Sequence, residues 1–218
     1  MILAVTGGKG GVGKSTVALN VAAELDAVVV DADLGMADLP ERRGPDLHDV
    51  LAERADPVEA VDESGVVDIL PCGRTLVGAK AAEPTALVGA VEAVERQYGR
   101  VVVDCPAGMS ADAGLPLLVA NRCLLVTRAD EFALPDAIRA RALARVLDAG
   151  IERLVLNMAG ESPPVERVRS VFDTPVVTVP RSDAISRAQR SGRPVTAVEA
   201  DGRASAQFER LAAVLLPD

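Results

Sequence analysis

The feature that most constrains this chain is the glycine-rich stretch GKGGVGKST at residues 8–16, which follows the short apolar run at residues 1–5. The stretch fits the pattern G-x-x-x-x-G-K-[ST], in which backbone N–H groups surround phosphates, the lysine reaches the outer phosphates and the hydroxyl contacts Mg²⁺. The apolar run predicts a strand and the residues after the loop predict a helix. The residues expected to bind nucleotide are Gly8, Lys9, Gly10, Gly11, Val12, Gly13, Lys14, Ser15 and Thr16.

A second lysine distinguishes this phosphate loop from the ordinary pattern. Lys14 occupies the position that the pattern requires, whereas Lys9 follows the first glycine, where no lysine is needed. Lysine is scarce in this chain, and two of its three copies lie in the loop. We interpret Lys9 as a sign that the nucleotide site is completed by a second subunit.

The same letters satisfy a weaker pattern. Gly8, Gly10 and Gly13 form G-x-G-x-x-G, and Asp31 lies about where a ribose-binding acid of a dinucleotide site would be. The two interpretations differ at Lys14 and Ser15, because a triphosphate with Mg²⁺ needs both side chains and a dinucleotide needs neither. A glycine-rich turn without a ligand is the third alternative. The pattern favours a mononucleotide site.

Short apolar runs alternate with helical patterns along the whole chain, which predicts a doubly wound, mainly parallel α/β sheet flanked by helices in one domain, residues 1–218. The predicted strands are Ile2–Val5, Ala27–Val30, Val66–Leu70, Arg100–Val103, Cys123–Val126, Leu154–Leu156 and Val176–Val179. The predicted helices are Lys14–Leu25, Asp46–Ala52, Thr85–Gln97, Ala111–Ala120, Pro135–Ala149, Pro164–Val171, Ser182–Ser191 and Ala204–Leu215.

Ligands of such sheets lie beyond the carboxyl ends of the strands, so the acidic residues found there are candidates. Asp31 and Asp33 follow the second strand and would share a side if the chain stayed extended. One could hold Mg²⁺ while the other orients the attacking water. Asp104 follows the fourth strand and is a candidate for the Mg²⁺ shell, with Ser15 and Asp31 as further metal ligands.

Later strand ends offer weaker candidates. Asn157 follows the sixth strand, where its amide could pair with adenine or simply form a turn. Pro180 follows the seventh strand, and its backbone could line the base pocket, with Ser182 as a helix N-cap. The single histidine, His48, is expected to be a surface or helix-packing residue.

Composition limits the remaining possibilities. The net charge of −9 disfavours broad binding to nucleic acid. Two arginine sets leave room for local contact: Arg139, Arg141 and Arg145, and separately Arg187, Arg190 and Arg193. Three scattered cysteines without a C-x-x-C pair indicate reduced thiols in a cytoplasmic protein. No apolar run is long enough for a membrane span, and no signal peptide is expected.

The segments GGKGGVGKST, DADLGMADL and VVVDCPAGM, in this order and spacing, closely resemble the deviant Walker-A ATPases of the MinD/ParA group. The resemblance implies an ATP- and Mg²⁺-dependent homodimer whose slow hydrolysis is often stimulated by a partner protein. It implies that Lys9 crosses to the partner's phosphates, Asp33 assists water, Asp104 serves Mg²⁺ and Asn157 contacts adenine. The family's usual functions are spatial positioning, partitioning and regulation of cell division.

The chain departs from this group at several positions, and these departures bear on its alternative functions. Met158 stands where an arginine usually follows the base-reading asparagine, and the last predicted helix lacks the basic face of a membrane-targeting helix, so we expect no membrane cycling. A metal-cluster carrier would use a C-x-x-C pair, which this chain does not have. A metabolic ATPase of the same loop class would need an inserted substrate pocket.

Overall fold

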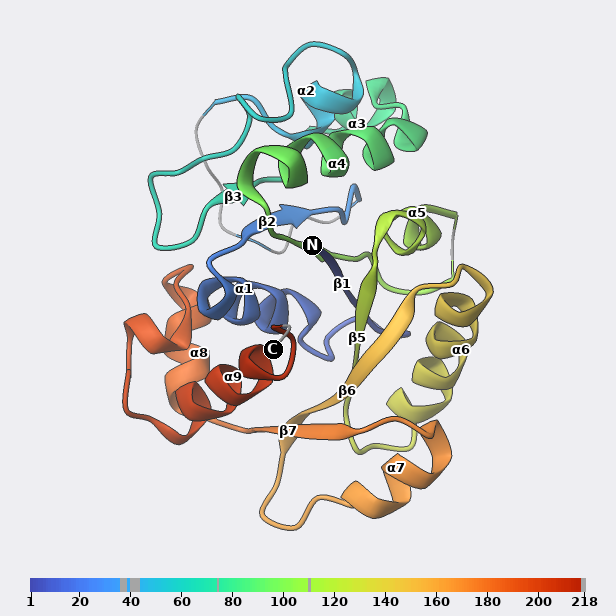
Figure 1. Ribbon diagram of the computed structural model, residues 1–218, viewed down its shortest axis with the longest axis vertical. Coiled ribbons are helices and arrows are strands. Elements are labelled where there is room, and N and C mark those ends of the chain that lie inside the picture. Colours follow the sequence, from blue (N-terminus) through green and yellow to red (C-terminus); the bar gives the residue numbers. More distant parts are fainter. Residues whose placement is uncertain (36–38, 40–43, 74, 110, 217–218) are drawn as a thin grey trace.

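The computed structural model describes residues 1–218 except 36–38, 40–43, 74, 110 and 217–218. In the described part of the chain, seven parallel strands form one sheet in the order β3-β2-β4-β1-β5-β6-β7 (Figure 1). The strands are β1 (Ile2–Thr6), β2 (Val28–Asp31), β3 (Ile69–Leu70), β4 (Val101–Asp104), β5 (Arg122–Thr127), β6 (Gly150–Ala159) and β7 (Val176–Pro180). The predicted doubly wound α/β fold is therefore confirmed.

Helices cover both faces of the sheet (Figure 1). The helices are α1 (Lys14–Leu25), α2 (Leu47–Leu51), α3 (Leu76–Ala81), α4 (Leu87–Tyr98), α5 (Ala111–Val119), α6 (Ala133–Val146), α7 (Val165–Phe172), α8 (Asp183–Arg190) and α9 (Arg203–Ala213), with short 3₁₀ turns η1 (Pro84–Ala86) and η2 (Val195–Ala197). Apolar residues of α1, α8 and α9 pack on one face. Those of α2, α4, α5, α6 and α7 pack on the other.

Alternation along the strands explains this two-sided burial. In β1, Leu3 and Val5 belong to the core beneath α1, whereas Ile2 and Ala4 belong to the core on the opposite face. Successive side chains of a strand point to opposite faces, so a strand covered on both sides must be apolar throughout. The Val- and Leu-rich runs of the sequence meet this requirement with few aromatic residues.

The strand order determines which loops meet. β1 lies between β4 and β5, and β2 lies on the other side of β4. All these strands are parallel, so the segments that follow them emerge at the same edge of the sheet. The phosphate loop and the segments after β2, β4 and β5 are thereby brought together at the position where doubly wound sheets bind ligands.

Helix α6 differs from its predicted bounds of Pro135–Ala149. It begins at Ala133 because the Asp130 carboxylate accepts hydrogen bonds from the backbone N–H groups of Phe132 and Ala133, at 3.2 and 2.9 Å. It ends before Asp148, whose φ of 55° leaves the helical region. The predicted helix was thus displaced toward the carboxyl end of the chain.

The region around β3 differs more from the predicted elements than α6 does. Strand residues were predicted over Val66–Leu70, but only Ile69 and Leu70 pair with β2, and Val66 is 58% exposed. Helix α3 was not predicted at all. Its first turn is capped by Thr75, whose hydroxyl accepts from the Gly78 N–H at 2.9 Å.

Candidate functional site

The loop between β1 and α1 adopts a backbone that favours glycine at two positions. Gly11 has a φ of 76° and Gly13 a φ of 94°. Gly13 is also the N-cap of α1, and it has no side chain with which to cap the first turn of this helix. Uncapped N–H groups at a helix start form a natural anion site. A Cβ at Gly10 or Gly11 would meet nothing within 4 Å, which leaves open space beside the loop.

The inner side of the same loop packs too closely for a side chain. A Cβ at Gly8 would lie 1.9 Å from the Asp136 carbonyl oxygen, and one at Gly13 would lie 2.2 Å from the Asn157 side-chain nitrogen. The start of α6 and the end of β6 therefore support the loop from behind. Glycines here serve close approach as well as conformation.

A lysine and two carboxylates lie buried at the edge beside the loop. Lys14 is 6% exposed, and Asp31 and Asp104 are each 1% exposed. Asp31 and Asp104 are register partners on β2 and β4, so their side chains project to the same face. Burial raises the pKa of the neighbouring Cys105 thiol, a shift that Cys123 and Asp104 increase and Lys14 opposes. Lys14 and Asp104 thus both act on the Cys105 thiol, and Asp31 is the register partner of Asp104.

This group of side chains fits the chemistry that Mg²⁺ prefers. The ion binds hard oxygen ligands and commonly takes one or two protein carboxylates. Asp31, Asp104 and the Ser15 hydroxyl supply such oxygens from β2, β4 and the first turn of α1. Two carboxylates buried on adjacent strands also need positive charge nearby. The predicted metal ligands are therefore in a suitable arrangement, and their role stays a prediction.

Asp33 reaches the same edge by a different path from the expected one. The chain does not stay extended after β2: the Leu34 N–H donates to the Ala32 carbonyl at 3.0 Å, which makes a tight turn. The Asp31 carboxylate accepts from the Asp33 N–H at 3.3 Å and from the Leu39 N–H at 3.4 Å. Asp31 is thus buried and organises the turn, while Asp33 lies half-buried beyond it. The rest of the predicted motif, residues 36–38, lies outside the described residues.

Asn157 contacts the phosphate loop directly. Its side-chain amide donates to the Val12 carbonyl at 2.8 Å, and the residue is 5% exposed. The register of β6 against β7 shifts between Leu156 and Ala159, and Met158 within this irregularity has a φ of 53°. Such bulges re-aim side chains. No sequence pattern indicates this contact. Since an amide has two N–H groups, contact with a base stays a prediction.

Pro180 ends β7 and lines a pocket of about 430 Å³. Its other lining residues are Ala159, Gly160, Glu161, Arg181, Ser182, Asp183 and Arg203. Ser182 caps α8 as predicted, because its hydroxyl accepts from the Ala184 N–H at 3.1 Å. The pocket lies at the carboxyl ends of β6 and β7. Its lining residue Ala159 is two residues beyond Asn157 on β6.

Lys9 is placed differently from Lys14. It is exposed, and its ammonium group lies 5.3 Å from the centre of the Phe132 ring, which is itself 66% exposed. An exposed cation–π contact of this kind contributes about 0.5–1 kcal/mol. The two lysines of the loop therefore occupy separate environments, one within the site and one on the surface.

His48 and Cys72 are close to the site, which the sequence did not indicate. His48 is 3% exposed, and its Nε2 lies 3.1 Å from the Leu34 carbonyl oxygen. The Cys72 thiol donates to the Asp33 carbonyl at 3.2 Å. Burial, with a further contribution from Asp31, raises the pKa of Cys72 to about 12, so this thiol stays protonated. Both contacts join residues far apart in the chain.

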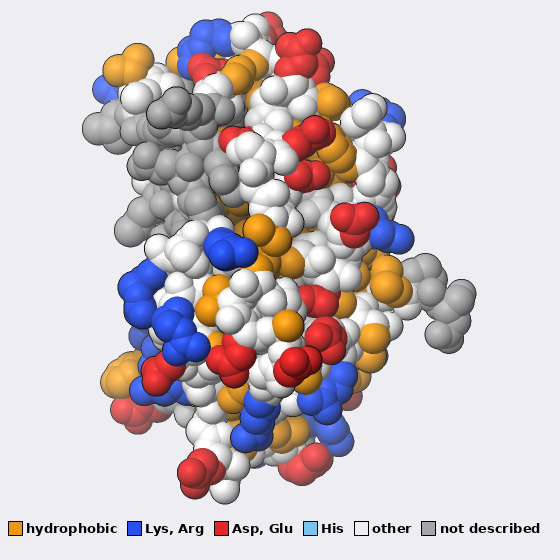
Figure 2. Space-filling view, turned by 90° about the vertical axis from the view of Figure 1, so that its left-hand side faces the viewer, with side chains coloured by type: hydrophobic (Ala, Val, Ile, Leu, Met, Phe, Trp, Pro, Cys, Tyr) orange, Lys and Arg blue, Asp and Glu red, His pale blue; other side chains and the backbone are white. Residues whose placement is uncertain are grey.

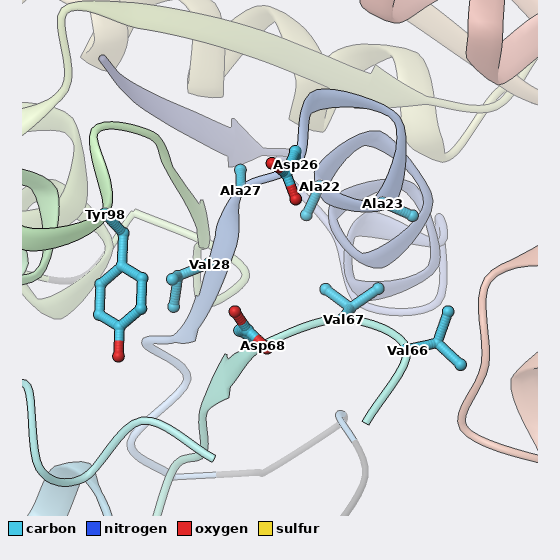
Figure 3. Close-up of a pocket in the computed structure, with 9 residues that line it drawn as sticks. All are labelled: Ala22, Ala23, Asp26, Ala27, Val28, Val66, Val67, Asp68 and Tyr98. Atoms are coloured by element: carbon cyan, nitrogen blue, oxygen red, sulfur yellow. The ribbon is translucent and has the colours of Figure 1, made fainter. Parts of the chain in front are cut away.

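A separate pocket of about 190 Å³ lies at the amino end of β2, away from the loop (Figure 3). Asp26, Asp68 and Tyr98 are among its labelled lining residues, and the Tyr98 hydroxyl donates to Glu63 at 2.8 Å. Burial, together with Glu63, Asp26 and Asp62, raises the pKa of Asp68. This acidic setting is unsuited to phosphates.

The raised pKa of Asp68 predicts a pH-dependent effect on stability. A carboxyl whose pKa is raised in the folded state favours folding at low pH, and this contribution is lost as the pH rises through the folded pKa. Asp68→Asn should therefore raise Tm at pH 7, by no more than about 2 °C because water screens the site. The gain should shrink as the pH falls toward about 4. An equal gain at both pH values, or the same profile for exposed Asp201→Asn, would contradict this origin.

The arginine sets considered for nucleic-acid contact are partly neutralised. Arg187 of α8 pairs with Glu199 at 3.2 Å, and Arg139 of α6 pairs with Asp136. On the side of the molecule that carries α8, acidic and basic side chains are interspersed (Figure 2). These pairings reduce the positive field that binding to a phosphate backbone requires.

None of the helices in the described ranges is long and apolar enough to cross a membrane. Likewise, no cluster of three or more His, Cys, Asp or Glu side chains that could hold a metal ion occurs among the described residues. Cys72, Cys105 and Cys123 are all buried thiols.

Comparisons with known proteins agree with this geometry. A crystal structure of the cell division ATPase MinD of Pyrococcus furiosus superimposes with a TM-score of 0.91 and 28% identity, covering 98% of this chain and 97% of that one. MinD of Pyrococcus horikoshii in complex with Mg-ADP gives 0.90 and 27%, covering 98% and 95%. An uncharacterised ATP-binding protein of Methanocaldococcus jannaschii is 29% identical, over 99% of this chain and 88% of that protein.

The family model described as the CobQ/CobB/MinD/ParA nucleotide binding domain matches residues 3–195, which includes the loop, β1 to β7 and α1 to α8. The family match, the phosphate loop and the strand order of the sheet all indicate the same kind of nucleotide-binding domain. The chain therefore belongs to the CobQ/CobB/MinD/ParA family of nucleotide-binding domains.

Proposed function

We propose that this protein is an ATP-hydrolysing switch that forms a homodimer when ATP is bound. The observation that carries the proposal is the contrast between its two loop lysines. Lys14 is buried beside the carboxylates, where it can serve its own nucleotide, whereas Lys9 is exposed, where it can reach a second subunit. Residues 1–218 would act as one nucleotide-binding domain.

The loop and its neighbours would bind the nucleotide. Backbone N–H groups of residues 8–16 would surround the phosphates, and the Lys14 ammonium would neutralise them. Asn157 would contact adenine while it supports Val12, and Pro180 would line the base pocket. Thr16, in the first turn of α1, would contact the phosphates through its hydroxyl.

The acidic residues would organise hydrolysis. Ser15, Asp31 and Asp104 would hold Mg²⁺, which neutralises phosphate charge when bound. The Asp33 carboxylate would orient a water for attack on the γ-phosphorus, so that the bond to the β–γ bridging oxygen breaks and ADP and phosphate leave. Lys9 of each subunit would leave Phe132 and approach the phosphates held by the other subunit.

The cellular role follows from relatives only in outline. Similar proteins are named for cell division, septum placement and chromosome partitioning, so we propose a role in positioning or division with a further protein partner or activator. Buried, unpaired thiols support a cytoplasmic location.

Sizing with defined nucleotides tests the switch. Asp33→Ala, which should bind but not hydrolyse ATP, should elute at twice the monomer mass of 22.6 kDa with Mg-ATP and as a monomer with Mg-ADP. Adding Lys9→Ala should abolish the dimer, whereas adding Lys80→Ala, on the exposed side of α3, should not. A monomer under all nucleotide and salt conditions would overturn the dimer switch.

A further inference from the structure

Two buried side chains hold the backbone of the segment that carries Asp33. His48 Nε2 lies 3.1 Å from the Leu34 carbonyl oxygen, and the Cys72 thiol lies 3.2 Å from the Asp33 carbonyl oxygen. The thiol and the imidazole also contact each other, with 3.8 Å between Sγ and Nε2. We call this pair the His48–Cys72 clamp. It holds two consecutive peptide groups just after the proposed water-orienting residue.

The imidazole has a defined orientation. A carbonyl oxygen only accepts hydrogen bonds, so Nε2 must carry the hydrogen toward Leu34. Nδ1 is buried and has no hydrogen-bond partner among the described residues. A buried unpaired nitrogen lowers stability, so packing alone would be better served by an apolar side chain. The benefit of a histidine therefore lies at Nε2, on the loop side.

Two glycines leave room for the ring. A Cβ at Gly73 would lie 1.6 Å from His48 Nδ1, and one at Gly78 would lie 3.1 Å from the same atom. Gly73 directly follows Cys72, so the segment that supplies the thiol also leaves space for the imidazole. Gly73 and Gly78 thus both leave space for the His48 ring of the clamp.

The clamp is attached to the hydrophobic core. His48 lies in α2, whose N-cap Asp46 forms a reciprocal capping box with Asp49. The Leu47 N–H donates to the Pro71 carbonyl at 2.8 Å, which joins α2 to the segment just after β3. Leu47 and Leu51 are almost fully buried in the core on this face of the sheet.

Asp33 is therefore held on both sides of its Cα. Its N–H donates to the Asp31 carboxylate at 3.3 Å, and its carbonyl accepts from Cys72. The next carbonyl, that of Leu34, is held by His48. Fixing both adjoining peptide groups fixes the direction of the Cα–Cβ bond, which determines where a carboxylate can reach.

We propose that His48 is a positioning residue that, with Cys72, fixes the backbone of Asp33 and so directs its carboxylate toward the attacking water. This inference rests on the proposed hydrolytic role of Asp33. The reach of an oriented group matters because a misplacement of about 1 Å can lower a rate a hundredfold. The clamp should therefore affect turnover more than nucleotide affinity.

Paired substitutions separate the hydrogen bond from packing. His48→Gln can place an amide N–H near the position of Nε2, whereas His48→Met keeps a side chain of similar length without a donor. We expect His48→Met to lower kcat for ATP about tenfold while KM changes less than about twofold. His48→Gln should restore most of kcat. Val50→Ala, on the same helix and 8% exposed, should leave kcat unchanged although it lowers stability.

A second pair covers the case in which His48→Met does not fold. Cys72→Ala removes the other donor and should also lower kcat, whereas Cys72→Ser keeps a donor and should lower it less. Amide hydrogen exchange over residues 31–35 gives a readout independent of turnover. Exchange there should be faster in His48→Met and Cys72→Ala than in wild type, His48→Gln or Val50→Ala.

Combination with Asp33→Ala separates the role of the clamp from the role of Asp33. The clamp should hold this backbone whether or not the Asp33 carboxylate is present, so His48→Met should also speed amide exchange over residues 31–35 in the Asp33→Ala background. Wild-type turnover in His48→Met, or an unchanged exchange rate in residues 31–35, would overturn the clamp while the switch stands. If Asp33→Ala itself hydrolyses ATP like the wild type, the proposed role of Asp33 fails and the clamp's role fails with it.

Discussion

Replacing Lys14 by methionine should lower ATP turnover at least about a hundredfold and weaken nucleotide binding as well. Methionine retains much of the length and packing of this 6%-exposed side chain but removes its charge. The phosphates would then meet Asp31 and Asp104 without the ammonium that offsets them. Turnover is measured by phosphate release, and affinity by titration with a fluorescent ADP analogue.

The third lysine of the chain provides the control for this prediction. Lys80 lies exposed on α3, so Lys80→Met removes the same charge away from the loop. It should leave turnover and affinity within about twofold, since water and salt screen an exposed charge. Equal losses in Lys14→Met and Lys80→Met would show that net charge is the cause. Full activity of Lys14→Met would place the nucleotide elsewhere.

Replacing Gly13 by alanine should disrupt the loop itself. The Gly13 φ of 94° is unfavourable for any residue with a Cβ, and the new methyl group would lie 2.2 Å from the Asn157 amide nitrogen. Backbone strain of this kind costs about 1–3 kcal/mol, and the clash adds to it. We expect a lower free energy of unfolding and loss of detectable nucleotide binding. Denaturant unfolding and ligand titration measure the two effects.

Gly10→Ala is the matched control in the same loop. A Cβ at Gly10 meets nothing within 4 Å, so folding stability should change by less than about 1 kcal/mol. The double variant Gly13→Ala/Asn157→Ala should recover only part of the lost stability, because it relieves the clash but leaves the φ strain. Full recovery would mean that the close approach alone requires glycine here, and no loss in Gly13→Ala would refute the loop geometry.

Local patterns predicted the elements that depend on local signals. Helix α1 has the predicted bounds because a glycine-rich start and a continuous apolar face specify it, and the strands with Val- and Leu-rich runs lie where expected. Acidic residues after β2 and β4 could be located because parallel strands deliver their carboxyl ends to one edge. The short helix α3 was missed because Gly78 lies within its six residues, and a glycine inside a helix weakens the helical signal.

Contacts between distant segments could not be predicted in this way. The amide of Asn157 reaches Val12 only because β6 is irregular at Met158, and no residue type there announces a bulge. His48 approaches Leu34 across 14 residues and Cys72 across 24, which no spacing rule describes. The turn at Asp33 was missed because the Asp31 carboxylate, assigned only to metal, also accepts backbone hydrogen bonds.

The position of β1 in the sheet has a consequence for synthesis of the chain. Its partners are β4 and β5, so β1 pairs with residues 101–104 and 122–125. Until those residues leave the ribosome, β1 has neither neighbouring strand, and the phosphate loop after it lacks the segments that pack against it. Domains dominated by such distant pairings fold slowly. A segment translated before both of its sheet neighbours thus gains its native contacts late.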